Sequence, residues 1–327
     1  MKKLLITGGA GFIGSHMVDL LLEKNFKVLI LDNLSTGHEK NISHLKKNPN
    51  LDVKFADCCS INNKDKFFKG IDGVFHFAGI GDIVPSLDEP SKYMKNNIEG
   101  TVNMLEVARF NNASKFVYSA SSSCYGLAKT PTNETHMINP QYPYALSKYL
   151  GERAVFHWNK VYKLPINSIR IFNAYGLRVR TTGAYGAVFG VFLKQRLSKK
   201  SLTVVGSGEQ KRDFLYVTDV AEAFYRAYQT KLTGQIWNLG AGNPQSINYL
   251  VKLIGGEVVY IPKRPGEPDC TWADITKITK DLEWKPKVSF EDGVELMIKN
   301  INNWSDAPLW NKKNINEATK NWFKYLG

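Results

Sequence analysis

The sequence contains few cysteines and no long apolar run, and both absences narrow the class of protein. Only four of the 327 residues are cysteine, and their spacing matches neither a zinc site nor a disulfide framework. We therefore expect reduced thiols and a cytoplasmic location. The apolar stretch that follows the first two lysines stops at Gly8, which is too short for a signal peptide or a membrane span. The sequence predicts no transmembrane segment.

Acidic residues are also fewer than basic residues, and this excess of positive charge predicts anionic partners. There are 43 Lys and Arg against 30 Asp and Glu, which gives a net charge of +13. The lysines are scattered and form neither a basic helix nor an aromatic–basic stripe, so we expect no nucleic-acid binding. The length and the 43% hydrophobic content indicate a folded chain of one large domain or two fused ones.

The N-terminal segment has the pattern of a dinucleotide-binding turn. An apolar strand at 4–7 runs into the glycine-rich stretch 8–14, a helical pattern follows, and a second strand at 27–31 ends on Asp32. Glycines allow a tight turn and a close approach of the backbone to a pyrophosphate at the helix N-terminus. Asp32 is placed to accept hydrogen bonds from ribose hydroxyls and would repel a 2′-phosphate. The pattern favours NAD over NADP.

Further strands alternate with helical patterns along the chain. We expect strands at 53–57, 73–79, 115–119 and 167–172. This alternation predicts an α/β fold, a doubly wound parallel Rossmann sheet with a smaller C-terminal substrate-binding domain. The NAD-binding domain is expected to span 1–176 plus 216–240, and the substrate-binding domain 177–215 plus 241–327.

Three residues are candidates for catalysis. Pro143 begins a predicted helix on which Tyr144 and Lys148 lie one turn apart on the same face. A neighbouring ammonium and a nicotinamide cation would both favour the phenolate, so the pair can serve as a base and its tuner. Ser121, at the end of the preceding strand, can hydrogen-bond the reacting oxygen. A tyrosine and a lysine four apart also occur by chance, and only the nucleotide-binding turn upstream favours the catalytic interpretation.

The ordered motifs of the chain resemble those of a known family. They include Thr7–Gly14, Asn97–Thr101, Ser121–Gly126 with Tyr144 and Lys148, Arg170–Gly176, Gln210–Val217 and Arg264–Pro268. With these motifs, nearly the whole chain resembles an extended short-chain dehydrogenase/reductase of the NAD-dependent nucleotide-sugar epimerase/dehydratase family. The closest pattern is that of UDP-glucose/UDP-galactose or UDP-N-acetylglucosamine 4-epimerases.

The resemblance implies a set of binding residues, to be carried over by position. For NAD it implies Gly8, Gly11, Phe12, Ile13, Asp32, Asn33, Ser35, Thr36, Gly37, Asp57, Cys58, Phe77, Ala78, Gly79, Asn97, Tyr144, Lys148 and Phe172. For a nucleotide-diphospho-sugar it implies Ser86, Ser121, Ser122, Ser123, Tyr144, Asn173, Ala187, Val188, Val205, Arg212 and Arg264. Arginine forks also suit a diphosphate on chemical grounds. No metal is expected.

The reaction that the resemblance implies is inversion of a sugar carbon, most simply C4, through a transient 4-keto sugar. Related 4,6-dehydratases carry an Asp-Glu pair after the catalytic hydroxyl residue, whereas Ser122 and Ser123 stand here. Neither serine is a carboxyl acid or base, so we expect no dehydratase activity. Decarboxylation of a UDP-hexuronate, C2 or C5 epimerisation, reduction of a keto sugar and a non-catalytic NAD-dependent sensor stay open as alternatives.

Several features of the second half of the chain leave the substrate open. Val205 stands where relatives often place an aromatic ring over the nucleobase. Arg178 and Arg180 could meet an extra negative group on the sugar or lie in a solvated loop. The aromatic C-terminal segment is interpreted as a docking helix or a subunit contact. The family resemblance implies a homodimer through the Tyr144 helix and the 97–109 stretch.

Overall fold

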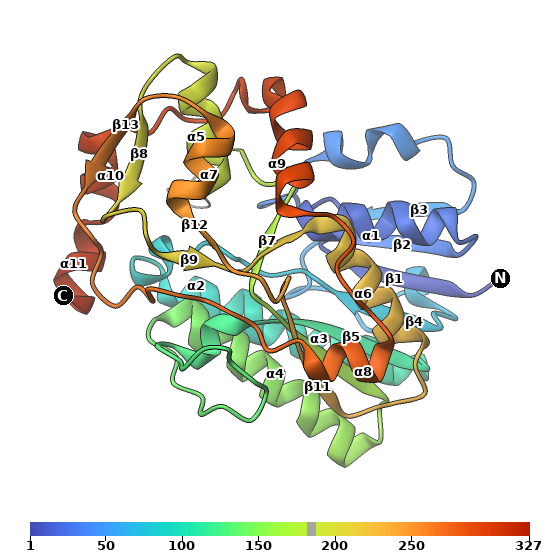
Figure 1. Cartoon of the computed structure of the whole chain (residues 1–327). Coiled ribbons are helices and arrows are strands. Elements are labelled where there is room, and N and C mark those ends of the chain that lie inside the picture. The colour runs from blue at the N-terminus through green and yellow to red at the C-terminus, as the bar shows by residue number, and fades with distance from the viewer. Residues whose placement is uncertain (182–187) are drawn as a thin grey trace.

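A parallel sheet forms the centre of the protein, and the computed structural model describes residues 1–181 and 188–327 (Figure 1). Its seven strands lie in the order β11 (Gln235–Leu239), β6 (Ile166–Ile171), β5 (Lys115–Ser121), β4 (Gly73–His76), β1 (Lys3–Thr7), β2 (Lys27–Asp32) and β3 (Leu51–Phe55). Every pairing in this sheet is parallel. The order reverses beside β1, so ligands are expected at the carboxyl ends of β1 and β4. The predicted doubly wound α/β fold is confirmed.

Alternating side chains of the strands bury both faces of the sheet. Leu4 and Ile6 of β1 pack with helices α1 (Phe12–Glu23) and α6 (Val217–Gln229). Leu5 points to the opposite face and packs with α3 (Gly100–Phe110) and α4 (Pro143–Tyr162). This two-residue period explains why the strands read as continuous apolar runs. Figure 1 shows the two helical layers on either side of the sheet.

A smaller set of elements covers the carboxyl ends of the strands. It contains the pairs β8 (Leu202–Val205) with β13 (Val258–Ile261), β9 (Lys211–Arg212) with β12 (Gln245–Ser246) and β7 (Asn173–Tyr175) with β10 (Phe214–Tyr216). Helices α5 (Val188–Leu197), α7 (Ile247–Ile254) and α9 (Phe290–Lys299) share one apolar core with them. The domain boundaries given above stay a prediction.

The remaining elements connect these layers. They are α2 (Pro90–Met94), α8 (Thr276–Leu282), α10 (Lys312–Ala318), α11 (Lys320–Leu326) and the short helices η1 (Glu39–Leu45), η2 (Lys66–Phe68), η3 (Val84–Leu87), η4 (Lys95–Glu99), η5 (Ser122–Tyr125) and η6 (Ile301–Trp304). None of the helices at 1–181 and 188–327 is long and apolar enough to cross a membrane.

Two predicted strands differ from the observed ones at their ends. The strand expected at 53–57 spans Leu51–Phe55, and the strand expected at 73–79 stops at His76. The residues beyond each end leave the ladder: Asp57 accepts a hydrogen bond from the Cys59 N–H, and Gly79 has a φ of +153°. The chain turns there, so both predictions ran a few residues too far into the pocket loops.

Candidate functional site

One pocket runs along the carboxyl ends of the central strands and continues under the smaller set of elements. Most of the predicted site residues line it together. These are Gly8, Gly11, Phe12, Ile13, Asp32, Asn33, Ser35, Thr36, Asp57, Cys58, Phe77, Ala78, Gly79, Ser121, Ser122, Ser123, Tyr144, Lys148, Phe172, Asn173, Val188, Val205, Arg212 and Arg264. Gly8 and Arg264, which are 256 positions apart in the sequence, therefore share one cavity.

The glycine turn between β1 and α1 is shaped for an anionic ligand. Gly8 has a φ of +70°, which favours glycine. A Cβ atom on Gly14 would lie 2.1 Å from the Gly8 carbonyl oxygen, so the helix can approach the turn only without a side chain. Helix α1 begins at Phe12 directly after the turn, and its first N–H groups face the pocket end of the sheet. The turn therefore fits the diphosphate of a dinucleotide.

The carboxylate of Asp32 is fixed at the end of β2. One oxygen accepts a hydrogen bond from the Ala10 N–H at 2.9 Å, and the other accepts from the Leu34 N–H at 2.8 Å. Burial raises the pKa of Asp32, and these two hydrogen bonds partly offset the rise. Each oxygen keeps a further acceptor site, as two ribose hydroxyls require. The residues present thus fit an adenosine ribose without a 2′-phosphate.

A second carboxylate lines the same end of the pocket. Asp57 accepts hydrogen bonds from the Asn33 side chain at 3.1 Å and from the Cys59 N–H at 2.8 Å. Burial alone would raise the pKa of Asp57, but these hydrogen bonds lower it below its ordinary value. The neighbouring Cys58 thiol is buried, which raises its pKa strongly, so it lines the pocket as a neutral, weakly polar group.

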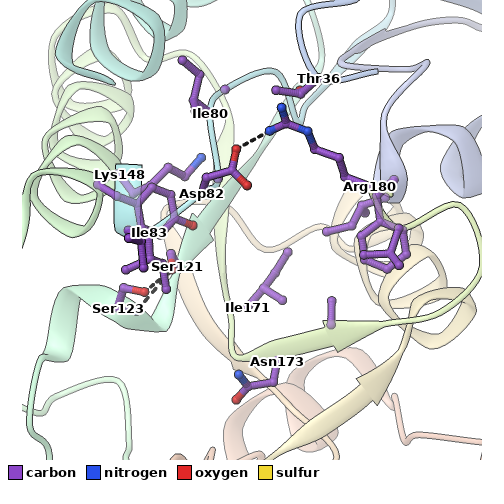
Figure 2. Close-up of a pocket in the computed structure, with 18 of the residues that line it drawn as sticks. Thr36, Ile80, Asp82, Ile83, Ser121, Ser123, Lys148, Ile171, Asn173 and Arg180 are labelled. Carbon is purple, nitrogen blue, oxygen red and sulfur yellow. Dashed lines mark hydrogen bonds and ion pairs between the residues drawn. The ribbon is translucent and has the colours of Figure 1, made fainter. Parts of the chain in front are cut away.

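The three catalytic candidates meet where β5 ends and α4 begins. Ser121 and Tyr144 line the pocket together, the Ser121 hydroxyl lowers the pKa of the phenol, and it donates to the Ser123 hydroxyl at 3.1 Å. Figure 2 shows Ser121, Ser123 and Lys148 around one end of the pocket. Burial raises the pKa of Tyr144, and the Ser121 hydrogen bond offsets only part of that rise. Without bound ligands the Tyr144 side chain is therefore a protonated phenol. The Lys148 ammonium does not by itself convert it to a phenolate.

Lys148 is held behind the tyrosine in a buried position. Its side chain is 6% exposed, its ammonium lies 4.7 Å from the centre of the Tyr118 ring, and burial lowers its pKa to about 8. Glu152, one turn further along α4, opposes this fall. Glu152 itself is paired with the buried guanidinium of Arg170, whose Nη2 lies 2.5 Å from its Oε1. A buried ion pair thus lies one helical turn beyond the lysine on α4.

Two arginines converge at the opposite side of the pocket. Arg212 and Arg264 both contact Glu267, with N–O distances of 3.7 and 2.8 Å. Arg212 also donates to the Pro268 carbonyl at 2.9 Å, and burial followed by the charge of Arg264 lowers its pKa. Two guanidinium groups share one carboxylate, which leaves a net positive charge for a diphosphate. Asn173 accepts a hydrogen bond from Thr271 at 2.6 Å between these arginines and the sheet.

Four predicted residues do not line the pocket as described. Gly37 packs against the Ala10 backbone, where a Cβ would lie 2.9 Å away. Ser86 is fully buried and donates to the Ile83 carbonyl. Asn97 is 1% exposed and hydrogen-bonds the N–H and C=O of Ile80, so it holds the pocket loop from behind. Ala187 lies outside the described residues.

Sequence reasoning missed several pocket residues. Asp82, in the loop after β4, pairs with Arg180, as the dashed line in Figure 2 shows. Arg178, the other arginine of that segment, pairs with Asp19 at 2.7 Å and is not in the pocket lining. Trp310 and Trp322 also line the pocket. Their large aromatic side chains were visible in the sequence, but nothing in the local pattern places them beside residues more than a hundred positions away.

Comparison with known proteins agrees with this geometry. The family described as GDP-mannose 4,6 dehydratase matches residues 5–297. The chain belongs to the extended short-chain dehydrogenase/reductase family of nucleotide-sugar epimerases and dehydratases. The predicted resemblance is thereby confirmed.

Individual members of this epimerase/dehydratase family resemble nearly the whole chain. A putative UDP-glucose 4-epimerase of Methanocaldococcus jannaschii is 38% identical over 92% of this chain and 97% of its own length. UDP-glucuronic acid decarboxylase 2 of Arabidopsis thaliana is 31% identical over 91% of this chain and 68% of its own. The crystal structure of UDP-glucuronic acid 4-epimerase from Bacillus cereus, in complex with UDP-glucuronic acid and NAD, superposes with a TM-score of 0.86 at 31% identity, covering 92% and 99% of the two chains.

Proposed function

We propose that the protein is an NAD-dependent epimerase that inverts C4 of a UDP-hexose or UDP-N-acetylhexosamine through a transient 4-keto sugar. The observation that carries the proposal is that Ser121, Tyr144, Lys148 and two arginines line one pocket with the glycine turn. NAD is the cofactor, because the fixed Asp32 carboxylate fits an unphosphorylated ribose and the similar B. cereus enzyme binds NAD. When bound, it accepts hydride from the sugar carbon and returns it.

The protein's own residues would move the proton. Tyr144 is the acid and base at the sugar hydroxyl, and Ser121, which lines the pocket beside it, would hydrogen-bond the reacting oxygen. Because burial raises the pKa of Tyr144 above the already high value of a phenol, loss of its proton needs added positive charge in the pocket. Lys148 supplies one such charge from α4, and its lowered pKa lets it exchange a proton near neutral pH. Arg212 and Arg264 hold the diphosphate, so the sugar can turn while its anchor stays fixed.

A second candidate function is a reaction on a UDP-hexuronate. Arg180 lines the pocket, and the Arabidopsis relative is a UDP-glucuronic acid decarboxylase. Its guanidinium is already paired with Asp82, however, and Figure 2 shows the two side chains pointing toward one another. A sugar carboxylate would have to approach a neutral pair and face the Asp82 charge. The pair therefore favours a sugar with an uncharged C6 group.

The test is to incubate the NAD-loaded protein with UDP-glucose, UDP-N-acetylglucosamine, UDP-glucuronate and matched GDP- and CDP-sugars, and to follow the products by NMR. We expect the C4 epimer of one UDP-sugar whose sugar carries no charge, and no accumulation of NADH. A 4-keto-6-deoxy sugar would refute the exclusion of dehydratase activity that rests on Ser122 and Ser123. A pentose product, or NADH formed in proportion to substrate, would refute the epimerase assignment itself.

We also propose that the protein forms a homodimer through α3 and α4. Exposed apolar side chains recur along α4 at Leu146, Leu150 and Val161, which are 39%, 38% and 49% exposed. Phe110, at the end of the adjoining helix α3, is 51% exposed. An apolar stripe of this length on two neighbouring helices is typical of a helix-to-helix interface. Light scattering at micromolar concentration should give twice the chain mass, and a monomer would count against the dimer.

A further inference from the structure

The C-terminal segment, residues 298–327, extends beyond the part of the chain that matches the family, yet it reaches the pocket. The family match ends at residue 297, whereas Ala307, Pro308, Trp310 and Trp322 are among the lining residues. Part of the pocket wall is thus built by a segment outside the family match. The question is what that wall would contact.

The wall near Trp310 is the apolar end of the pocket. Trp310 and Val205 of β8 pack against the apolar core that contains Phe192 of α5 and Ile247 of α7, and all four residues line the pocket. In Figure 1, β9 with Arg212 lies between α4, which carries Tyr144, and β8. A nucleotide sugar with its diphosphate at the arginines and its sugar at Tyr144 would place its nucleobase toward β8. Apolar and aromatic faces are what a base stacks on.

Trp310 is tied to β8 by a buried glutamine. Gln195, which is 1% exposed, donates from Nε2 to the Trp310 carbonyl at 2.8 Å and to the Thr203 hydroxyl at 2.8 Å. Its Oε1 accepts from the Thr203 N–H at 3.1 Å. Thr203 and Val205 are two residues apart on one strand and share a face, so the glutamine holds Trp310 on the pocket side of β8. A buried amide with these three bonds fixes the segment firmly.

A second anchor holds the start of the segment. Trp304 is fully buried in the core shared by α5, and Lys194 donates to the Ser305 carbonyl. The seven residues from Trp304 to Trp310 are therefore held on α5 at both ends. Such a short, doubly anchored stretch has little freedom to leave the pocket wall.

We propose that Trp310 supplies the aromatic face for the nucleobase in the place that Val205 leaves without a ring. The inference rests on the proposed function, because it requires a nucleoside diphosphate at the two arginines. It assigns to the C-terminal segment a direct part in holding the nucleotide. Because every base has a π-face, Trp310 strengthens binding of the nucleotide without selecting among bases.

The test compares UDP binding by calorimetry to NAD-loaded wild type, Trp310→Ala and Trp310→Phe. Loss of one base–aromatic stack should weaken UDP binding about 5- to 150-fold in Trp310→Ala, while Trp310→Phe keeps most of the affinity. Binding of inorganic pyrophosphate, which has no base, should not change. The control is Leu309→Ala, at an exposed neighbour that is not in the pocket lining, and it should bind UDP as the wild type does.

Unchanged UDP affinity in Trp310→Ala would overturn the inference. Equal losses of UDP and pyrophosphate affinity would also overturn it, because they would mark a merely structural tryptophan. With the substrate identified, KM should rise in Trp310→Ala while kcat changes little, since the stack is made in both the ground and transition states. If the wild type bound none of UDP, GDP, CDP and dTDP, the proposed function would fail, and this inference with it.

Discussion

Replacing Lys148 with methionine should stabilise the protein at neutral pH while it ends turnover. Lys148 is 6% exposed, and burial lowers its pKa from an ordinary 10.5 to about 8. At about 1.36 kcal/mol per pKa unit, that fall corresponds to a cost on the order of 3 kcal/mol for keeping the charge in the folded protein. Methionine has a similar length and no charge, so the variant avoids this cost. Turnover is lost because the pocket then lacks the charge that favours the Tyr144 phenolate.

The sign of the pH dependence follows from where the proton binds more tightly. The unfolded chain holds the Lys148 proton up to about pH 10.5, whereas the folded protein releases it near pH 8. Below pH 8 the lysine is charged in both states and the wild type carries the full cost. Above the unfolded pKa it is neutral in both, and the cost is gone. Between these values the wild type should gain about 1.36 kcal/mol per pH unit relative to Lys148→Met.

The assay is urea unfolding of wild type and Lys148→Met at half-unit steps from pH 7 to 10, in the absence of added nucleotide. Lys129→Met, at an exposed lysine, is the matched control and should differ from wild type by a constant amount. The difference between wild type and Lys148→Met should shrink steadily above pH 8. A difference that stays flat across this range would refute the claim that burial depresses the Lys148 pKa.

Four further changes have defined outcomes. Tyr144→Phe should lower kcat at least about 100-fold with NAD affinity little changed, and a smaller loss would argue against its role as acid and base. Asp32→Ala should weaken NAD binding and narrow the preference over NADP, whereas an unchanged ratio of the two dissociation constants would count against the ribose contact. Asp82→Asn should raise kcat/KM for UDP-glucuronate relative to UDP-glucose. An unchanged ratio would show that the Asp82–Arg180 pair does not select the substrate. Glu152→Ala should lower the free energy of unfolding by about 3–5 kcal/mol, because Arg170 is left buried without its partner; a loss under about 1 kcal/mol in urea unfolding would contradict this.

The sheet and its nucleotide-binding end could be predicted because their signals are local. The strand at Leu4, the glycine turn and Asp32 follow one another within a single βαβ unit, and Tyr144 and Lys148 lie one helical turn apart. Such geometry follows from residue spacing within one helix or one turn, so it can be predicted without knowing the long-range contacts. Gly14 belongs to the same local pattern, since only its missing side chain lets α1 approach the turn.

The rest of the pocket wall depends on contacts that no short pattern encodes. The Asp82–Arg180 pair joins residues 98 apart in the sequence, and the Gln195 bond to the Trp310 carbonyl spans 115. Ser86 shows the opposite error, because a pocket residue expected by position is buried beneath its loop. Which side chain lines a cavity is decided by how the smaller set of elements docks on the sheet, and that packing is visible only in three dimensions.

Transfer of deuterium from C4 tests the central claim most directly. The NAD-loaded protein would be incubated with UDP-glucose and UDP-N-acetylglucosamine labelled with deuterium at C4, in ordinary water, and the products followed by NMR. Oxidation and reduction at C4 within one closed pocket predict an inverted C4 that keeps its deuterium. An epimer with hydrogen from the solvent at C4, or a product inverted at another carbon with C4 untouched, would contradict C4 epimerisation through a transient 4-keto sugar.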